Sequence, residues 1–125
     1  MNLPKNLKYS ASHEWVKTEG DQVVIGITDF AQKELGDLVF INLPNVGDEI
    51  VHDEAFADVE SVKAVSDIIS PVNGVITEVN EALLDAPELI NQDAYDAWII
   101  KAKDVSGLDS LLSAEQYEEL ISKEA

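Results

Sequence analysis

Residues 55–69 read AFADVESVKAVSDII, and this stretch decides the expected fold. Ala55 to Val65 has the pattern of two strands around a short reversal, and Ile68-Ile69 continues the alternation. Lys63 would lie at the tip of a β-turn, where a modifying enzyme can reach it from several sides. The simpler explanation of Lys63 is that its charge lies at a strand edge and discourages aggregation. Its ε-amine on a flexible four-carbon stem would also make a good acyl acceptor once deprotonated.

Similar signals on both sides of this hairpin predict a mainly β chain. Short aliphatic or β-branched runs bounded by Gly, Pro, Asn or Asp predict further strands, at 23–27, 38–43, 72–79 and 98–100. Asn73-Gly74 offers a hairpin turn. Capping patterns predict a short helix at about 28–35, and a C-terminal helix that follows Ser113-Ala114-Glu115-Gln116.

Length and composition predict a single domain. The 125 residues, 46% of them hydrophobic, are enough to fill one core. We expect one domain over residues 1–125, with a β core at 1–103 and a C-terminal helical extension at 104–125. No run approaches eighteen apolar residues, and the first residues resemble neither a signal peptide nor a transit peptide, so a cytoplasmic protein is expected.

The charge restricts the partners. Eight lysines, no arginine and 25 acidic residues give a formal net charge of −17. Such a surface would repel nucleic acids and anionic membranes, so neither is expected as a partner. The acidity either keeps the protein soluble or speeds docking onto basic patches of larger partners. Cysteine is absent, which removes disulfides and thiolate chemistry and suits a reducing compartment.

The usual catalytic and metal-binding patterns are missing. His13-Glu14 begins like a zinc-protease motif, but the second histidine of that motif is absent. His52 lies beside Asp53 and Glu54 in a polar stretch, where a solvated loop is expected. No Gly-rich phosphate loop appears, and no serine has an obvious histidine partner. We therefore expect no metal site and no unaided catalysis.

Several short segments occur in a specific order along the chain. They are Tyr9 with Ser12-His13-Glu14-Trp15, Ile25 to Gln32, Leu35 to Phe40 with Leu43-Pro44, Glu60 to Ala64 with Ser66-Asp67, Pro71 to Gly74, and Pro87 to Asn91. In this order and spacing the chain resembles the glycine cleavage H-protein family along nearly its whole length. Ala94-Tyr95-Asp96-Ala97-Trp98 departs from the family pattern, because it lacks the usual Pro and Gly before Trp and is shorter.

The resemblance implies a lipoyl-domain fold and a carrier function. The fold would be a flattened, barrel-like sandwich of two antiparallel sheets (a barrel-sandwich hybrid) with a short internal helix and a C-terminal helix. Lys63 would carry lipoate in amide linkage, attached by a lipoyl ligase or octanoyl transferase. The lipoyl disulfide would accept an aminomethyl group from glycine decarboxylase, a pyridoxal-phosphate enzyme. A tetrahydrofolate-dependent aminomethyltransferase would take the carbon, and dihydrolipoyl dehydrogenase would reoxidise the dithiol. The chain would be a monomeric carrier and not an enzyme.

The resemblance also implies roles for residues around the lysine. In the family the loaded arm folds back toward residues that match Ser12, Glu14 and Asp67 here, and Glu60 would take part in ligase recognition. Physically, an aminomethyl thioether hydrolyses in water, so a carrier benefits from a cleft that excludes water. The cationic amine needs oxygen acceptors when it is desolvated. Ordinary surface carboxylates are the alternative interpretation of Glu14 and Asp67.

Two other functions fit the same hairpin. A lipoyl carrier that passes lipoate to 2-oxoacid dehydrogenase complexes would need the same lysine, and the sequence does not separate the two roles. A biotin carrier or an unmodified binding module is the remaining alternative. Biotinyl lysines usually have Met on both sides, whereas Val62 and Ala64 flank Lys63 and Met1 is the only methionine. This pattern disfavours biotin.

Overall fold

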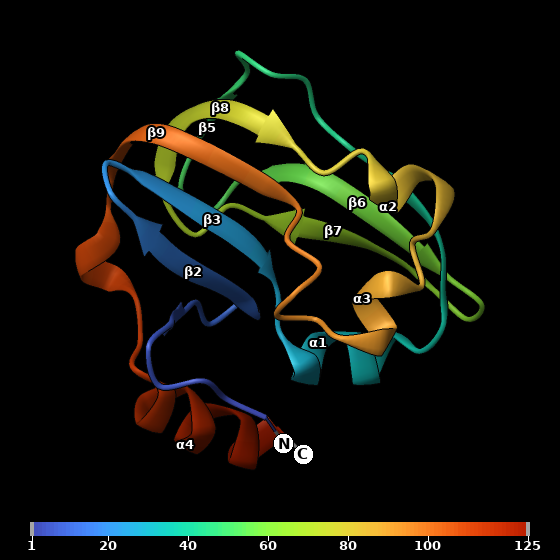
Figure 1. The fold of residues 1–125 in the computed structure, drawn as a ribbon. Coiled ribbons are helices and arrows are strands. Elements are labelled where there is room, and N and C mark those ends of the chain that lie inside the picture. The colour runs from blue at the N-terminus through green and yellow to red at the C-terminus, as the bar shows by residue number, and fades with distance from the viewer. Residues whose placement is uncertain (1, 125) are drawn as a thin grey trace.

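The structure, a computed structural model, describes residues 2–124 and consists of two antiparallel sheets with helices around them (Figure 1). The six-stranded sheet contains, in spatial order, β1 (Lys8–Tyr9), β2 (Glu14–Glu19), β3 (Gln22–Ile27), β9 (Ile100–Ser106), β8 (Asn73–Val79) and β5 (Glu49–Ile50). The three-stranded sheet contains β4 (Leu38–Asn42), β6 (Ala55–Ser61) and β7 (Val65–Ile69). The helices are α1 (Asp29–Leu35), α2 (Ala82–Asp85), α3 (Leu89–Gln92), the 3₁₀ turn η1 (Leu108–Ser110) and α4 (Ala114–Glu124).

The main core lies between the two sheets. Successive residues of a strand point to opposite faces, so every second residue enters this core. Val23 and Ile25 enter it from β3 and Val59 enters it from β6, each at most 2% exposed. Each buried side chain of this size stabilises the fold by about 1.5–3 kcal/mol. Within residues 2–124 the two sheets share no strand, so the predicted two-sheet architecture is confirmed as a sandwich and not a closed barrel.

A second apolar cluster lies on the outer face of the six-stranded sheet, where α4 packs. Val24 points into it from between two core residues of β3, as strand alternation requires. Trp15 of β2 joins it, and Tyr117 of α4 stacks on Tyr9 with ring centroids 4.8 Å apart. The C-terminal helix is therefore fixed to the sheet by a buried aromatic pair.

Both predicted helices are confirmed with their caps. The side chain of Thr28 accepts a hydrogen bond from the backbone N–H of Ala31 at the start of α1, and Gly36 ends that helix with φ of 83°. At the start of α4, Ser113 N–H donates to Gln116 Oε1 and Gln116 N–H donates to Ser113 Oγ. These reciprocal bonds are the expected capping box. No helix of the described residues is long and apolar enough to cross a membrane.

The hairpin turn predicted at Asn73-Gly74 is wrong. Both residues lie inside β8, where Gly74 pairs with Ile50 of β5. A β-carbon added at Gly74 would lie 2.9 Å from the carbonyl oxygen of Lys103, so this glycine lets β9 approach closely. The strand predicted at 98–100 begins at Ile100 and runs to Ser106.

Candidate functional site

Lys63 lies at the tip of the β6–β7 hairpin, as the sequence predicts. The backbone N–H groups of Lys63 and Ala64 both donate to Ser61 Oγ, at 3.3 Å and 3.0 Å. Ser61 N–H donates to the carbonyl oxygen of Ala64 at 2.7 Å. Ser61 itself is only 6% exposed, so a buried hydroxyl holds the turn while the lysine is exposed.

The stem of Lys63 crosses the C-terminal end of α1. A β-carbon added at Gly36 would lie 3.4 Å from Lys63 Cε, and the N–H of Val62 donates to the carbonyl oxygen of Asp37 at 3.0 Å. Gly36 therefore serves twice, because its left-handed backbone ends α1 and its missing side chain leaves room for the lysine. The loop after α1 and the hairpin tip form one unit.

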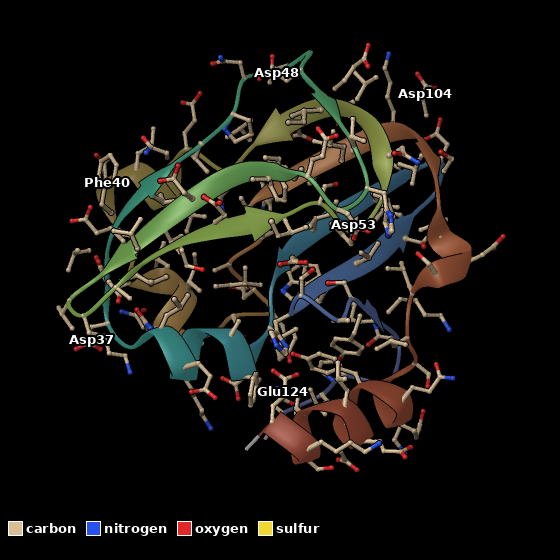
Figure 2. All side chains as sticks on the ribbon, turned by 180° about the vertical axis from the view of Figure 1, so that it is seen from behind. Asp37, Phe40, Asp48, Asp53, Asp104 and Glu124 are labelled. Carbon is tan, nitrogen blue, oxygen red and sulfur yellow. The ribbon has the colours of Figure 1, made fainter. Side chains whose placement is uncertain are left out.

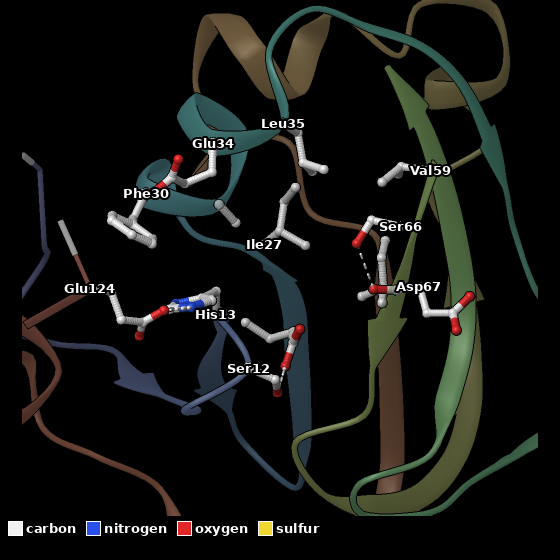
Figure 3. A pocket seen from close by; sticks show the side chains of 13 residues that line it. Ser12, His13, Ile27, Phe30, Glu34, Leu35, Val59, Ser66, Asp67 and Glu124 are labelled. Carbon is white, nitrogen blue, oxygen red and sulfur yellow. Dashed lines mark hydrogen bonds and ion pairs between the residues drawn. The ribbon is translucent and has the colours of Figure 1, made fainter. Parts of the chain in front are cut away.

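A cavity of about 280 Å³ opens beside this unit, between α1, the start of β2 and the strands β6 and β7 (Figure 3). Its apolar lining consists of Ile27, Phe30, Ala31, Leu35, Val59 and Ile68. Its polar lining consists of Ser12, His13, Glu14, Glu34, Ser66, Asp67 and Glu124. Leu35 precedes the glycine that the lysine stem crosses, so the cavity begins next to the lysine. A mostly aliphatic chain with a polar end would match this lining.

Glu14 is the buried acid of the cavity. It is 2% exposed, and its Oε1 accepts hydrogen bonds from Ser10 Oγ at 2.7 Å and from Ser12 Oγ at 2.5 Å. Burial raises the pKa of Glu14 to about 7, although the two serine hydroxyls oppose the shift by stabilising the carboxylate. Both hydroxyls converge on Oε1, which leaves Oε2 without a hydroxyl partner. Glu14 is therefore not an ordinary surface carboxylate.

Asp67 and Glu60 lie on the other side of the hairpin. Asp67 lines the cavity, but its carboxylate points away from the space that Ser12 faces (Figure 3). Strand alternation explains this, since Ser66 faces the cavity and the next residue of β7 turns outward. Glu60 is exposed on β6, where it pairs with Val65 of β7. The structure thus brings Ser12 and Glu14 together, without the carboxylates of Asp67 and Glu60.

His13 is a site residue that the sequence did not reveal. Its backbone has φ of 77°, the left-handed region that a non-glycine residue rarely adopts. Its Nδ1 lies 2.8 Å from Tyr117 Oη, its Nε2 lies 3.2 Å from Glu124 Oε1, and its ring packs 4.9 Å from that of Phe30. The sequence showed only half of a zinc motif here. Within residues 2–124, no cluster of three or more potential metal ligands occurs.

The other histidine is peripheral. His52 lies in a turn with its side chain 38% exposed, and its Nδ1 is 3.4 Å from Asp53 Oδ2. The expectation of a solvated position is confirmed.

The segment that departs from the family pattern folds as an ordered turn. The carbonyl oxygen of Ala94 accepts a hydrogen bond from Trp15 Nε1 at 3.0 Å. The hydroxyl of Tyr95 donates to the carbonyl oxygen of Asn2 at 2.7 Å and accepts from the N–H of Asp29 at 3.3 Å. Burial raises the pKa of Tyr95 to about 12. This segment therefore anchors the start of α1 without Pro or Gly.

The family model, the related sequences and the related structure that match this chain all belong to one family. The family model described as "Glycine cleavage H-protein" matches residues 7–124. Glycine cleavage system H proteins of Bacillus licheniformis and Halalkalibacterium halodurans are 55% and 56% identical to this chain. They cover 99% and 98% of it, and 100% and 98% of their own lengths. The crystal structure of a glycine cleavage system H protein from Mycobacterium marinum superimposes with a TM-score of 0.87 at 40% identity, covering 95% of this chain and 98% of that one.

Proposed function

Because this chain belongs to the glycine cleavage H-protein family and is a lipoyl-carrier shuttle of that system, we propose that Lys63 is the residue that carries lipoate. The single observation that supports this assignment is the position of Lys63. It is the exposed tip of a turn held by Ser61, and its stem crosses Gly36, the residue next to Leu35 of the cavity lining.

The lining of the cavity fits a lipoyl arm that folds back. Apolar side chains such as Ile27 and Ile68 can cover an aliphatic chain and exclude water from it. When bound, lipoate supplies a disulfide that takes up the aminomethyl group of glycine and a dithiol that is afterwards reoxidised. Lys63 tethers this group, and Ser12 and Glu14 receive the cationic end of the cargo. Glu14 holds the cation only as the carboxylate, because the protonated acid would offer a neutral partner.

Asp67 and Glu60 have a different role from Glu14. The carboxylate of Asp67 points outward (Figure 3), and Glu60 is exposed between the buried residues Val59 and Ser61 of β6. Both are therefore on the outer side of the hairpin, within reach of an enzyme that approaches Lys63. We assign Glu60 to recognition by the lipoyl ligase or octanoyl transferase. Asp67 lies in the lining of the cavity that would receive the arm. Because its carboxylate points outward, it suits ligase recognition better than cation binding.

The chain itself acts as a carrier and not as an enzyme. Its proposed partners are glycine decarboxylase, the aminomethyltransferase and dihydrolipoyl dehydrogenase, each of which must reach the lipoyl end of the arm. The net charge of −17 supports docking onto basic surfaces of these enzymes. The chain works as a single domain and as a monomer. Its compartment is the cytoplasm, and the absence of cysteine suits such a reducing compartment.

Mass spectrometry tests the assignment of Lys63. The apo protein is incubated with a lipoyl ligase, its intact mass is measured, and the modified peptide is mapped. We expect one lipoyl adduct, on Lys63, and none in Lys63→Arg. An adduct on any of the other seven lysines, or a biotinyl mass on the native protein, would contradict the proposal.

A further inference from the structure

Two residues that line the cavity, His13 and Glu124, have no role in the proposed binding of the arm by Ser12 and Glu14. Lys63 crosses Gly36 at one end of α1, whereas His13 packs on Phe30 near the other end. With a rise of 1.5 Å per helical residue, Gly36 and Phe30 are roughly 9 Å apart along α1. His13 and Glu124 therefore lie at the end of the cavity that is distal to the lysine (Figure 3).

The hydrogen bonds around His13 have one consistent direction. Glu124 can only accept at this distance, so His13 Nε2 carries the proton and donates to it. In the neutral ring with the proton on Nε2, His13 Nδ1 accepts from the hydroxyl of Tyr117, and the Tyr117 oxygen accepts in turn from the hydroxyl of Thr28 at 2.7 Å. This chain of donors leads from the N-cap of α1 to a carboxylate of α4. Because each bond polarises the next, the chain holds Glu124 at the distal end of the cavity.

The aminomethyl ammonium at the end of the loaded arm needs a second hydrogen-bond acceptor besides Glu14. An aminomethyl ammonium has three N–H donors, like the ammonium of lysine. Ser10 and Ser12 already occupy Glu14 Oε1, so Glu14 offers the ammonium mainly Oε2. Glu124 lines the same cavity, and its side chain is 42% exposed, so its carboxylate can turn toward a cation without the cost of full burial.

We propose that Glu124 is the second carboxylate that binds the cationic end of the loaded arm, with His13 as its positioning residue. This inference rests on the proposed function of Lys63. Glu14 and Glu124 together then distinguish the charged, loaded arm from the neutral oxidised and reduced arms. The C-terminal helix α4 thereby contributes to cargo selection and is not only a cover for the sheet.

The test uses the full-length protein lipoylated at Lys63, reduced, and loaded with formaldehyde and ammonia. The two histidines make ¹⁵N NMR of the imidazoles simple, since His52 serves as an internal reference. Loading should shift the His13 Nε2 signal and leave that of His52 in place. Glu124→Gln should abolish the shift, whereas Glu119→Gln on the same helix, 74% exposed and paired with Lys123, should retain it.

Release of formaldehyde from the loaded protein is the second measurement. Because Glu124 is partly solvated, Glu124→Gln should accelerate release by only about two- to fivefold, and Glu119→Gln should release at the wild-type rate. An unchanged His13 signal on loading, or equal release from Glu124→Gln and wild type, would overturn the role of Glu124. An intact mass without an adduct on Lys63 would instead contradict the proposed function, and the inference would fall with it.

Discussion

Glu14 shows at the residue scale how a buried carboxylate lowers the stability of the fold. Burial raises its pKa from the ordinary value of 4.5 to about 7, so between these pH values the folded protein holds a proton that the unfolded chain has released. The free energy of unfolding therefore decreases as the pH rises through this window, and the cost above pH 7 reaches roughly 3 kcal/mol. In the function proposed for Glu14, the charge that would bind the cation is the same charge that destabilises the fold.

Replacing this carboxylate should reverse the cost. Glu14→Gln keeps an oxygen that can accept from Ser10 and Ser12 but has no charge to desolvate. At pH 8 we expect the variant to be more stable than wild type, and below pH 4.5 the two should unfold alike. Thermal unfolding between pH 4 and 8 measures the difference, with the exposed Glu60→Gln as control. If the difference in stability between Glu14→Gln and wild type were the same at every pH in this range, Glu14 would not carry a buried charge above pH 7.

The same substitution should weaken protection of the cargo. Loss of a charge-assisted hydrogen bond of about 1.5–3 kcal/mol should accelerate formaldehyde release about tenfold or more. Lipoylation and reoxidation of the dithiol should remain nearly unchanged, because those steps need only the free arm. Wild-type release rates from the lipoylated Glu14→Gln protein would show that the arm binds elsewhere.

Lys63 should be unimportant for stability. Its side chain is exposed, and its backbone N–H, rather than its amine, joins the turn. We expect Lys63→Arg to change the free energy of unfolding by at most about 0.5 kcal/mol, while lipoylation disappears. Chemical denaturation of both proteins measures this. A large loss of stability would support the alternative that the lysine is structural.

At the scale of the element, the lysine hairpin depends on a single hydroxyl. Ser61→Ala removes the acceptor of two backbone N–H groups at the tip. We expect the free energy of unfolding to fall by about 1–3 kcal/mol. We expect faster hydrogen exchange at Lys63 and Ala64 and a slower rate of ligase-catalysed lipoylation. Ser106→Ala, at an exposed position at the end of β9, is the control. An unaltered lipoylation rate in Ser61→Ala would mean that the ligase does not need a preformed turn.

Elements were predictable where local signals agreed with tertiary packing. The hairpin and α1 follow from alternation, caps and turn residues over a few positions, so 55–69 and about 28–35 were predicted correctly. Helices α2 and α3 are four residues each, too short for a helical period to appear. Asn73-Gly74 carried a genuine turn signal, but the close approach of β9 determined the structure there.

The site was predictable only in part, for a similar reason. Lys63 is marked by its own neighbours in sequence, whereas the burial of Glu14 depends on α1 and the second sheet, which are remote from it in the chain. The contact of His13 with Tyr117 joins residues 104 positions apart, and no local pattern encodes it. The outward direction of Asp67 was available from strand alternation beside the inward-facing Ser66.

At the scale of the whole molecule, the excess of acidic residues sets the response to salt. A net charge of −17 creates repulsion within the folded protein, which added ions screen. We therefore expect the melting temperature at pH 7 to rise when NaCl is increased from 10 mM to 300 mM. Choline chloride, matched in ionic strength, is the control for binding of a specific cation. A fall in melting temperature would show that ion pairs outweigh the repulsion.

The two ends of the described chain lie in the same region of the molecule, beside α1 (Figure 2 shows α4 and Glu124 below the sheets). Tyr95 links Asn2 to Asp29, and Glu124 bonds to His13, whose ring packs on Phe30. Leu3 and Lys5 border a hollow together with Ala114 and Glu118 of α4. Neighbouring ends make a protein a candidate for circular permutation. A short linker could therefore join the ends, and the chain could be reopened in the exposed loop around Gly47, where a β-carbon would meet no atom within 4 Å. The order of the strands along the chain would change, while the lysine hairpin and its cavity would stay uninterrupted.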